Sequence, residues 1–176
     1  MKKEKKEGRS LHKCVVKSNS LVEARYRLSL QEAHVIFWLL TQINSDDEDF
    51  KIHKMDISEF SKMIGVEVDN QYSKLRLVTR SLMRRVLDIY ESEKQEWLQV
   101  AWLSSARYQR KKGAILLKFD PDLKLHLLQL KGQFTKIDII DTLKLKSIHA
   151  VRIFELLLQY ASLGKREISI DDLRMY

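Results

Sequence analysis

The chain has 176 residues, enough to bury one good hydrophobic core, or one core and the beginning of another. Its net charge of +8 favours a polyanionic partner, such as nucleic acid or an anionic membrane surface. No run approaches the ~18 apolar residues of a membrane span, and residues 1–7 lack the apolar core of a secretion signal. We therefore expect a cytoplasmic protein that does not enter a membrane.

Residues 1–13 are charged and show no apolar period, which predicts a disordered basic arm. Two interpretations of this arm are equally compatible with its composition: it contacts a DNA backbone, or it is only a solvated tail. The single cysteine, Cys14, excludes an internal disulfide. A thiol without a regulatory role is favoured there over a reactive one.

Two helix starts follow the arm. In each, a serine precedes a glutamate by three residues, as in a capping box: Ser20 with Glu23, and Ser29 with Glu32. The second helix is predicted over 30–43, where apolar side chains cover much of its circumference. We expect this helix to be buried on more than one side and to form core rather than a ligand site.

A helix-turn-helix is predicted next. The acidic loop at 44–49 ends the long helix, and it lacks the glycine-containing spacing of a calcium loop, so no metal site is expected. A short strand is predicted at 50–53. Asp56 caps a helix that ends at Gly65, and a second helix runs from about 70 to 87.

The second of these helices is strongly basic, and five of its residues are candidate DNA contacts: Lys74, Arg76, Arg80, Arg84 and Arg85. Positions 76, 80 and 84 follow i, i+4 spacing, at which like charges repel. Their presence therefore indicates an anionic partner. A solvated basic face is the alternative interpretation.

A basic hairpin is predicted after this helix. Strands are expected at 89–90, 97–108 and 114–119, and residues 109–113 form the tip between the last two. The hairpin cations suit phosphate contacts beside a recognition helix, as in a wing: Arg107, Arg110, Lys111, Lys112 and Lys118. Basic tips also keep sheets soluble, and that alternative stays open.

The remainder of the chain repeats an earlier order. A helix from 120 to 131 and a mixed segment at 137–145 precede a long apolar helix at 147–163, a strand at 167–170 and a helix start at Asp171. Long helix, loop, strand and Asp-led helix also follow one another after Ser29. We therefore predict an arm, a first winged-helix domain, and a linking helix with the truncated start of a second, at 1–13, 14–145 and 146–176.

Chemical motifs are missing from the sequence. The five histidines have no metal-ligand spacing, and the five glycines form no phosphate-binding loop or nucleophile elbow. The tyrosines lack the metal-binding histidine pair that a nicking replication enzyme needs. We expect no enzyme activity, no cofactor and no metal.

Two blocks carry a resemblance. The pattern Val-x-Ser-Asn-x-Leu-x-x-Ala-x-x-x-Leu-Ser at 16–29 is followed by Phe134-Thr135 and then by Ala-Val-Arg-Ile-Phe-Glu-Leu-Leu-Leu-Gln-Tyr at 150–160. Together they resemble the plasmid replication initiators built from two winged-helix domains. Ile153 and Phe154 replace the usual Leu and Tyr, an apolar-for-apolar change.

The resemblance implies binding to repeated origin sites as a monomer, repression of the protein's own promoter as a homodimer, and recruitment of host replication proteins. It implies that the first winged helix serves dimerisation and backbone contact, while the second reads much of the base sequence. The strand at 97–108, with its aromatic side chains, predicts a sheet edge available for self-association.

The residues alone predict an α+β winged-helix protein that binds double-stranded DNA. A winged-helix autorepressor without replication activity fits this prediction equally. A winged helix that binds only proteins fits less well because of the cations.

Overall fold

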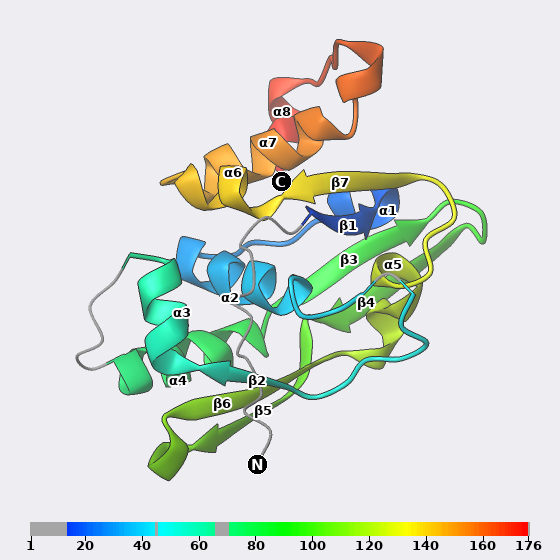
Figure 1. Ribbon diagram of the computed structural model, residues 1–176. Coiled ribbons are helices and arrows are strands. Elements are labelled where there is room, and N and C mark those ends of the chain that lie inside the picture. The colour runs from blue at the N-terminus through cyan, green and yellow to red at the C-terminus, as the bar shows by residue number, and fades with distance from the viewer. Residues whose placement is uncertain (1–13, 45, 66–70, 176) are drawn as a thin grey trace, which may run out of the picture.

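The computed structural model of the chain describes residues 14–44, 46–65 and 71–175, and it has the predicted α+β architecture (Figure 1). The predicted basic arm at 1–13 lies outside the described residues. No helix of the described part is both long and apolar enough to cross a membrane.

The N-terminal strand β1 (Cys14–Ser18) pairs antiparallel with β7 (Phe134–Asp138), far along the chain. Helix α1 (Asn19–Val22) follows directly, and its cap is Ser18, whose hydroxyl accepts from the Leu21 N–H. The capping box predicted at Ser20 is therefore wrong, since Ser18 is the residue with extended backbone before the helix.

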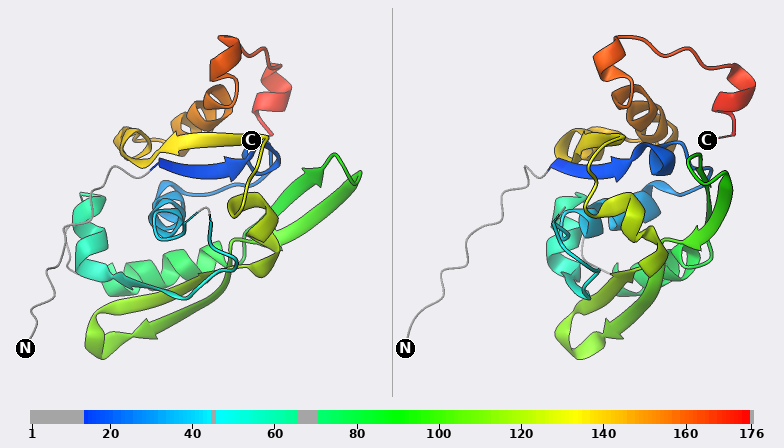
Figure 2. Two further views of the ribbon diagram at one scale, coloured as in Figure 1. Left: turned by 45° about the vertical axis from the view of Figure 1, so that its right-hand side comes forward. Right: turned by 90° about the vertical axis from the view of Figure 1, so that its right-hand side faces the viewer.

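Helix α2 (Leu30–Leu40) is the centre of the core (Figure 2). The predicted capping box is confirmed, because Ser29 accepts from the Glu32 N–H and Glu32 accepts from the Ser29 N–H. Val35 and Leu39 are fully buried. Figure 2 shows α2 between the β1–β7 pair and the sheet that carries β5 and β6, so the expected burial on several sides is confirmed.

The three-stranded antiparallel sheet has the order β2 (His53–Asp56), β6 (Ala114–Phe119), β5 (Leu103–Gln109). The strand predicted at 50–53 is displaced, because the pairing with β6 begins at His53. Asp56 ends β2 and caps α3 (Ile57–Met63), accepting from the N–H groups of Ser58 and Glu59.

Helix α4 (Gln71–Leu82) is shorter than predicted, because Val86 and Leu87 belong to β3 (Val86–Glu91). Strand β3 forms a hairpin with β4 (Glu96–Ala101). The single strand predicted at 97–108 is broken at Trp102, which is completely buried between β4 and β5. The two halves of that segment therefore lie in different sheets, which the continuous apolar pattern did not reveal.

The C-terminal part is helical. A 3-10 turn at Pro121–Leu123 leads into α5 (Lys124–Leu127), which ends earlier than predicted because Leu128 is extended and Gln129 has a positive φ. The mixed segment is the end of β7 followed by α6 (Ile139–Lys144), capped by Asp138.

Helix α7 (Ile148–Leu158) packs on β7 and buries Val151 and Leu156. The helix predicted at 147–163 is shorter, because α7 ends at Leu158 and a separate 3-10 turn follows at Ala161–Leu163. The strand predicted at 167–170 is absent from this described segment, because Ser169 instead caps α8 (Ile170–Leu173).

Candidate nucleic-acid interface

Helix α4 has one buried and one cationic face. Leu75, Thr79 and Leu82 are buried against the body of the domain. Lys74, Arg76 and Arg80 are exposed. Since a helix advances about 100° per residue, Lys74 and Arg76 flank the buried line through Leu75, and Arg80 points farther outward. The helix therefore has a stable orientation with its cations in solvent.

Two predicted contacts lie beyond the helix end. Arg84 is exposed on a turn that continues α4, with its N–H donating to the Ser81 carbonyl at 2.9 Å. Arg85 is half-buried, and its Nε lies 3.3 Å from Oε1 of the buried Glu32. Arg85 therefore joins the end of α4 to the start of α2, and only part of its guanidinium is available to a ligand.

The Glu32 carboxyl stays ionised in this position. Burial would raise its pKa, but donors from Ser29, Ser81 and Arg85 hold the pKa below its ordinary value. One carboxylate thus caps α2 and anchors the segment after α4.

Tyr108 of β5 fixes α4 against the sheet. Its hydroxyl donates to the Leu75 carbonyl at 3.2 Å and shares a second hydrogen bond with the Thr79 hydroxyl. Its ring stacks edge-on against Tyr72 at 5.5 Å between centroids. Sequence reasoning missed this role, although the alternation of β5 places Tyr108 on one face with Ala106, which also packs against the core.

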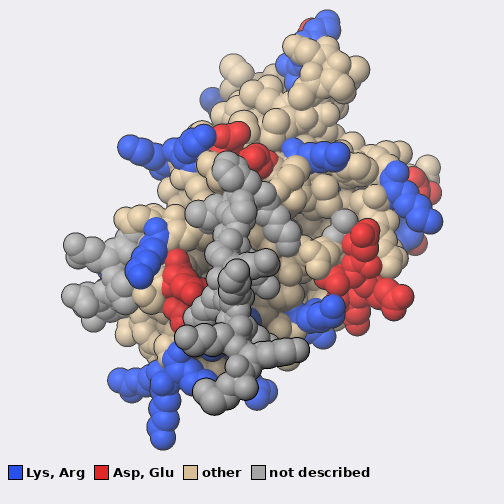
Figure 3. All heavy atoms as spheres, viewed as in Figure 1, with Lys and Arg blue, Asp and Glu red and all other residues tan. Residues whose placement is uncertain are grey.

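The turn between β5 and β6 carries the wing cations. Arg110, Lys111 and Lys112 form an exposed 3-10 turn closed by Gly113, whose φ of 57° is in the left-handed region that suits glycine. Figure 3 shows Lys and Arg gathered at this end of the molecule. Arg107 is exposed on β5, whereas Lys118 is partly buried on β6.

The wing turn is tied to the helix-turn-helix. The Gly113 carbonyl accepts from the Ile57 N–H at the start of α3, at 3.0 Å. Figures 1 and 2 place the turn on the same side of the molecule as α3 and α4. The structure therefore brings the helix cations and the wing cations to one side.

Apart from Arg85, the candidate cations of α4 and the wing lack acidic partners within the part of the chain that the structure describes. The ion pairs there include Arg85 but none of the other candidate contacts, Lys74, Arg76, Arg80, Arg84, Arg107, Arg110, Lys111 and Lys112. Their charge is thus available to an anionic ligand such as a phosphate backbone.

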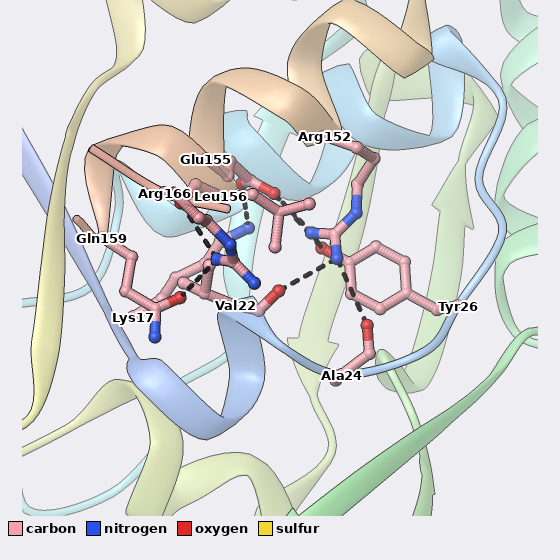
Figure 4. Close-up of polar contacts among 9 residues, drawn as sticks. All are labelled: Lys17, Val22, Ala24, Tyr26, Arg152, Glu155, Leu156, Gln159 and Arg166. Carbon is pink, nitrogen blue, oxygen red and sulfur yellow. Dashed lines mark hydrogen bonds and ion pairs between the residues drawn. The ribbon is translucent and has the colours of Figure 1, made fainter. Parts of the chain in front are cut away.

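A second polar cluster lies in the core, beneath α7 (Figure 4). Glu155 pairs with Lys17 and with Arg152, both at 2.6 Å. Arg152 also donates to the Tyr26 hydroxyl and to the carbonyls of Val22 and Ala24. The 150–160 block of the sequence therefore anchors the segment that leads into α2.

Charges in this cluster hold one another in place. Burial would raise the pKa of the Glu155 carboxyl, but Lys17 and Arg152 keep it below its ordinary value. The residue pattern at 150–160 contains Arg152 and Glu155 but does not by itself indicate their role. The sequence feature that could have indicated this buried cluster is a pair of opposite charges among the buried residues of α7, beside Val151 and Leu156.

Comparison with known proteins now identifies the family. The model of the family described as "Initiator Replication protein, WH1" matches residues 14–158. The chain belongs to this family. The resemblance seen in the two sequence blocks is therefore confirmed for an initiator replication protein.

Two relatives from Escherichia coli match this initiator family member along most of its length. A replication initiation protein is 25% identical over 169 residues, which are 91% of this chain and 52% of the relative. An uncharacterized 27.6 kDa protein is 24% identical over 162 residues, 85% of this chain and 68% of the relative. The chain thus spans about half the length of the first of these relatives.

A solved structure has the same fold. The Pi initiator protein, crystallised in complex with iteron DNA, aligns with a TM-score of 0.76 at 18% identity. The match covers 94% of this chain and 73% of that chain. The predicted α+β winged-helix fold is confirmed.

Proposed function

We propose that this chain is the N-terminal DNA-binding module of a plasmid replication initiator, which binds duplex DNA at origin repeats and at its own promoter. The observation that carries the proposal is the cationic face of α4, placed on the same side as the basic wing turn. Family membership and the Pi initiator's printed complex with iteron DNA support the same ligand class.

In this proposal the two clusters have different roles. Helix α4 enters the major groove, where Arg80 and Arg84 reach base edges, and Lys74 and Arg76 grip the backbone. Arg107, Arg110, Lys111 and Lys112 contact phosphates beside the groove, while Arg85 supports the end of α4 through Glu32. Tyr108 of β5 holds α4 at a fixed angle to the sheet through its hydrogen bond to the Leu75 carbonyl.

Self-association is a second part of the proposal. The predicted aromatic edge is smaller than expected, because Trp102 is buried and Tyr108 packs on α4. Tyr90 and Trp97 remain exposed as directly paired residues on the β3–β4 hairpin, with ring centroids 5.1 Å apart. We propose that a homodimer forms through this hairpin and that the monomer binds origin repeats.

Family membership supports two further parts of the proposal, which concern host proteins and the C-terminal residues. We propose that host replication proteins are recruited by the complete initiator. Residues 146–176 are proposed to be the linking helix and the start of a second winged-helix domain, which supplies much of the base reading.

The test compares two variants on a preferred duplex, selected with this chain, and on random duplex. Arg80→Ala should weaken binding to the preferred duplex more than to the random one, by roughly 1–3 kcal/mol. The double variant Lys111→Ala/Lys112→Ala should weaken binding to the preferred duplex and to the random duplex equally. Lys165→Ala, on the distant C-terminal segment, is the matched charge control. Absence of duplex binding at low salt, or equal losses for Lys165 and the candidate cations, would overturn the proposal.

A further inference from the structure

One apolar side chain lies in the middle of the cationic face of α4. Leu77 is 67% exposed. It is two residues beyond the buried Leu75, so it projects about 200° around the helix, nearly opposite the core. Lys74 and Arg76 lie on the two flanks of this face, and Leu77 projects between them.

The surroundings of Leu77 distinguish it from an ordinary exposed leucine. Single exposed leucines are common, and one alone carries no information. The residues one turn away on the same face are Ser73 and Arg80, both exposed. An anionic ligand attracted to Lys74 and Arg76 must therefore cover Leu77 as well.

Duplex DNA offers a specific apolar partner at this position. When the centre of a helix face lies in the major groove, its flanks approach the phosphates of the two strands. The apolar group exposed on the floor of that groove is the C5-methyl group of thymine. Another protein's apolar surface would fit poorly, because the flanking cations would be brought against it without partners.

We infer that Leu77 is a specificity-determining residue that recognises thymine through its C5-methyl group. The inference rests on the proposed function, since α4 must lie in the major groove. Arg80, one turn farther along, supplies the polar contact on the same face, and Lys74 and Arg76 hold the backbone. The chain then prefers a thymine within the site even where no hydrogen bond reads that base.

Replacing thymine by deoxyuridine removes only the methyl group. A pool of duplexes selected with wild-type chain is amplified with dTTP or with dUTP, and affinities are measured for both versions. We expect wild-type chain to bind the uridine pool about fourfold more weakly for each methyl in contact, from about 0.8 kcal/mol per buried methyl. Leu77→Ala and Leu77→Gln should bind both pools equally.

Leu125→Ala is the matched control, because Leu125 is 66% exposed on α5, outside the cationic face, and this variant should keep the wild-type preference. Equal wild-type affinity for both pools, or a preference that persists in both Leu77 variants, would overturn the inference. Salt-dependent duplex binding would still uphold the proposed function in those two cases. Loss of duplex binding by the wild-type chain itself would overturn both.

Discussion

Replacing Glu155 with Gln should destabilise the fold strongly, although the change keeps the shape of the side chain. Glu155 is 1% exposed and accepts from Lys17 and Arg152, both almost fully buried. The Glu155→Gln variant would leave these two buried cations facing a neutral amide. Removing one member of a buried ion pair costs about 3–5 kcal/mol.

The loss is measurable by thermal and urea unfolding followed by circular dichroism. For a domain of this size, about 2–4 °C of melting temperature correspond to each kcal/mol, so we expect a decrease of roughly 6–20 °C. Glu167→Gln is the matched control, because its pair with Lys165 is 88% and 81% exposed, and it should change stability by less than about 1 kcal/mol.

A double-mutant cycle with Lys17→Met separates lost packing from uncompensated charge. If the cost arises from the unpaired ammonium of Lys17, the double variant should recover part of the stability lost in Glu155→Gln. A Glu155→Gln loss no larger than that of Glu167→Gln would refute the account of the cluster as the anchor of α7.

Two further predictions concern acid and assembly. The pKa of the Glu155 carboxyl is lowered in the folded state, so its contribution to the free energy of unfolding is complete above the ordinary Glu pKa of about 4.3 and is lost as pH falls through the folded-state pKa. Glu155→Gln should therefore flatten the decrease of stability at acid pH. An unchanged decrease would contradict this prediction. Trp97→Lys, at a side chain 61% exposed beside Tyr90, should shift sedimentation at tens of micromolar from dimer to monomer. The far-UV circular dichroism of the variant should stay that of the folded chain, because the side chain is exposed. A wild-type monomer under the same conditions would contradict the proposed dimer.

Local signals predicted the helices that surround the site. The capping box at Ser29, the Asp56 cap and the alternation of apolar residues in β6 each act within a few residues, so the sequence revealed α2, α3 and the wing. The i, i+4 spacing of Arg76, Arg80 and Arg84 was likewise visible in the sequence, and all three side chains are exposed.

Nonlocal contacts explain what the sequence did not reveal. Strand β1 pairs with β7 across the length of the domain, and no local pattern indicates that partner. Trp102 divides one apolar segment between two sheets, because burial of its ring in the core outweighs a continuous strand. Arg85 was predicted to contact DNA, because its ion-pair partner Glu32 lies on another helix and no local pattern indicates that pair.

The salt dependence of duplex binding tests the central claim most directly. Each phosphate neutralised by a Lys or Arg contributes a slope of about −0.9 to log K against log salt. We predict a steep negative slope for the wild-type chain. Replacing Arg110, Lys111 and Lys112 with Gln should make it shallower by up to about 2.7, from three contacts. A flat wild-type response, or a slope unaltered in the wing variant, would contradict DNA binding by α4 and the wing.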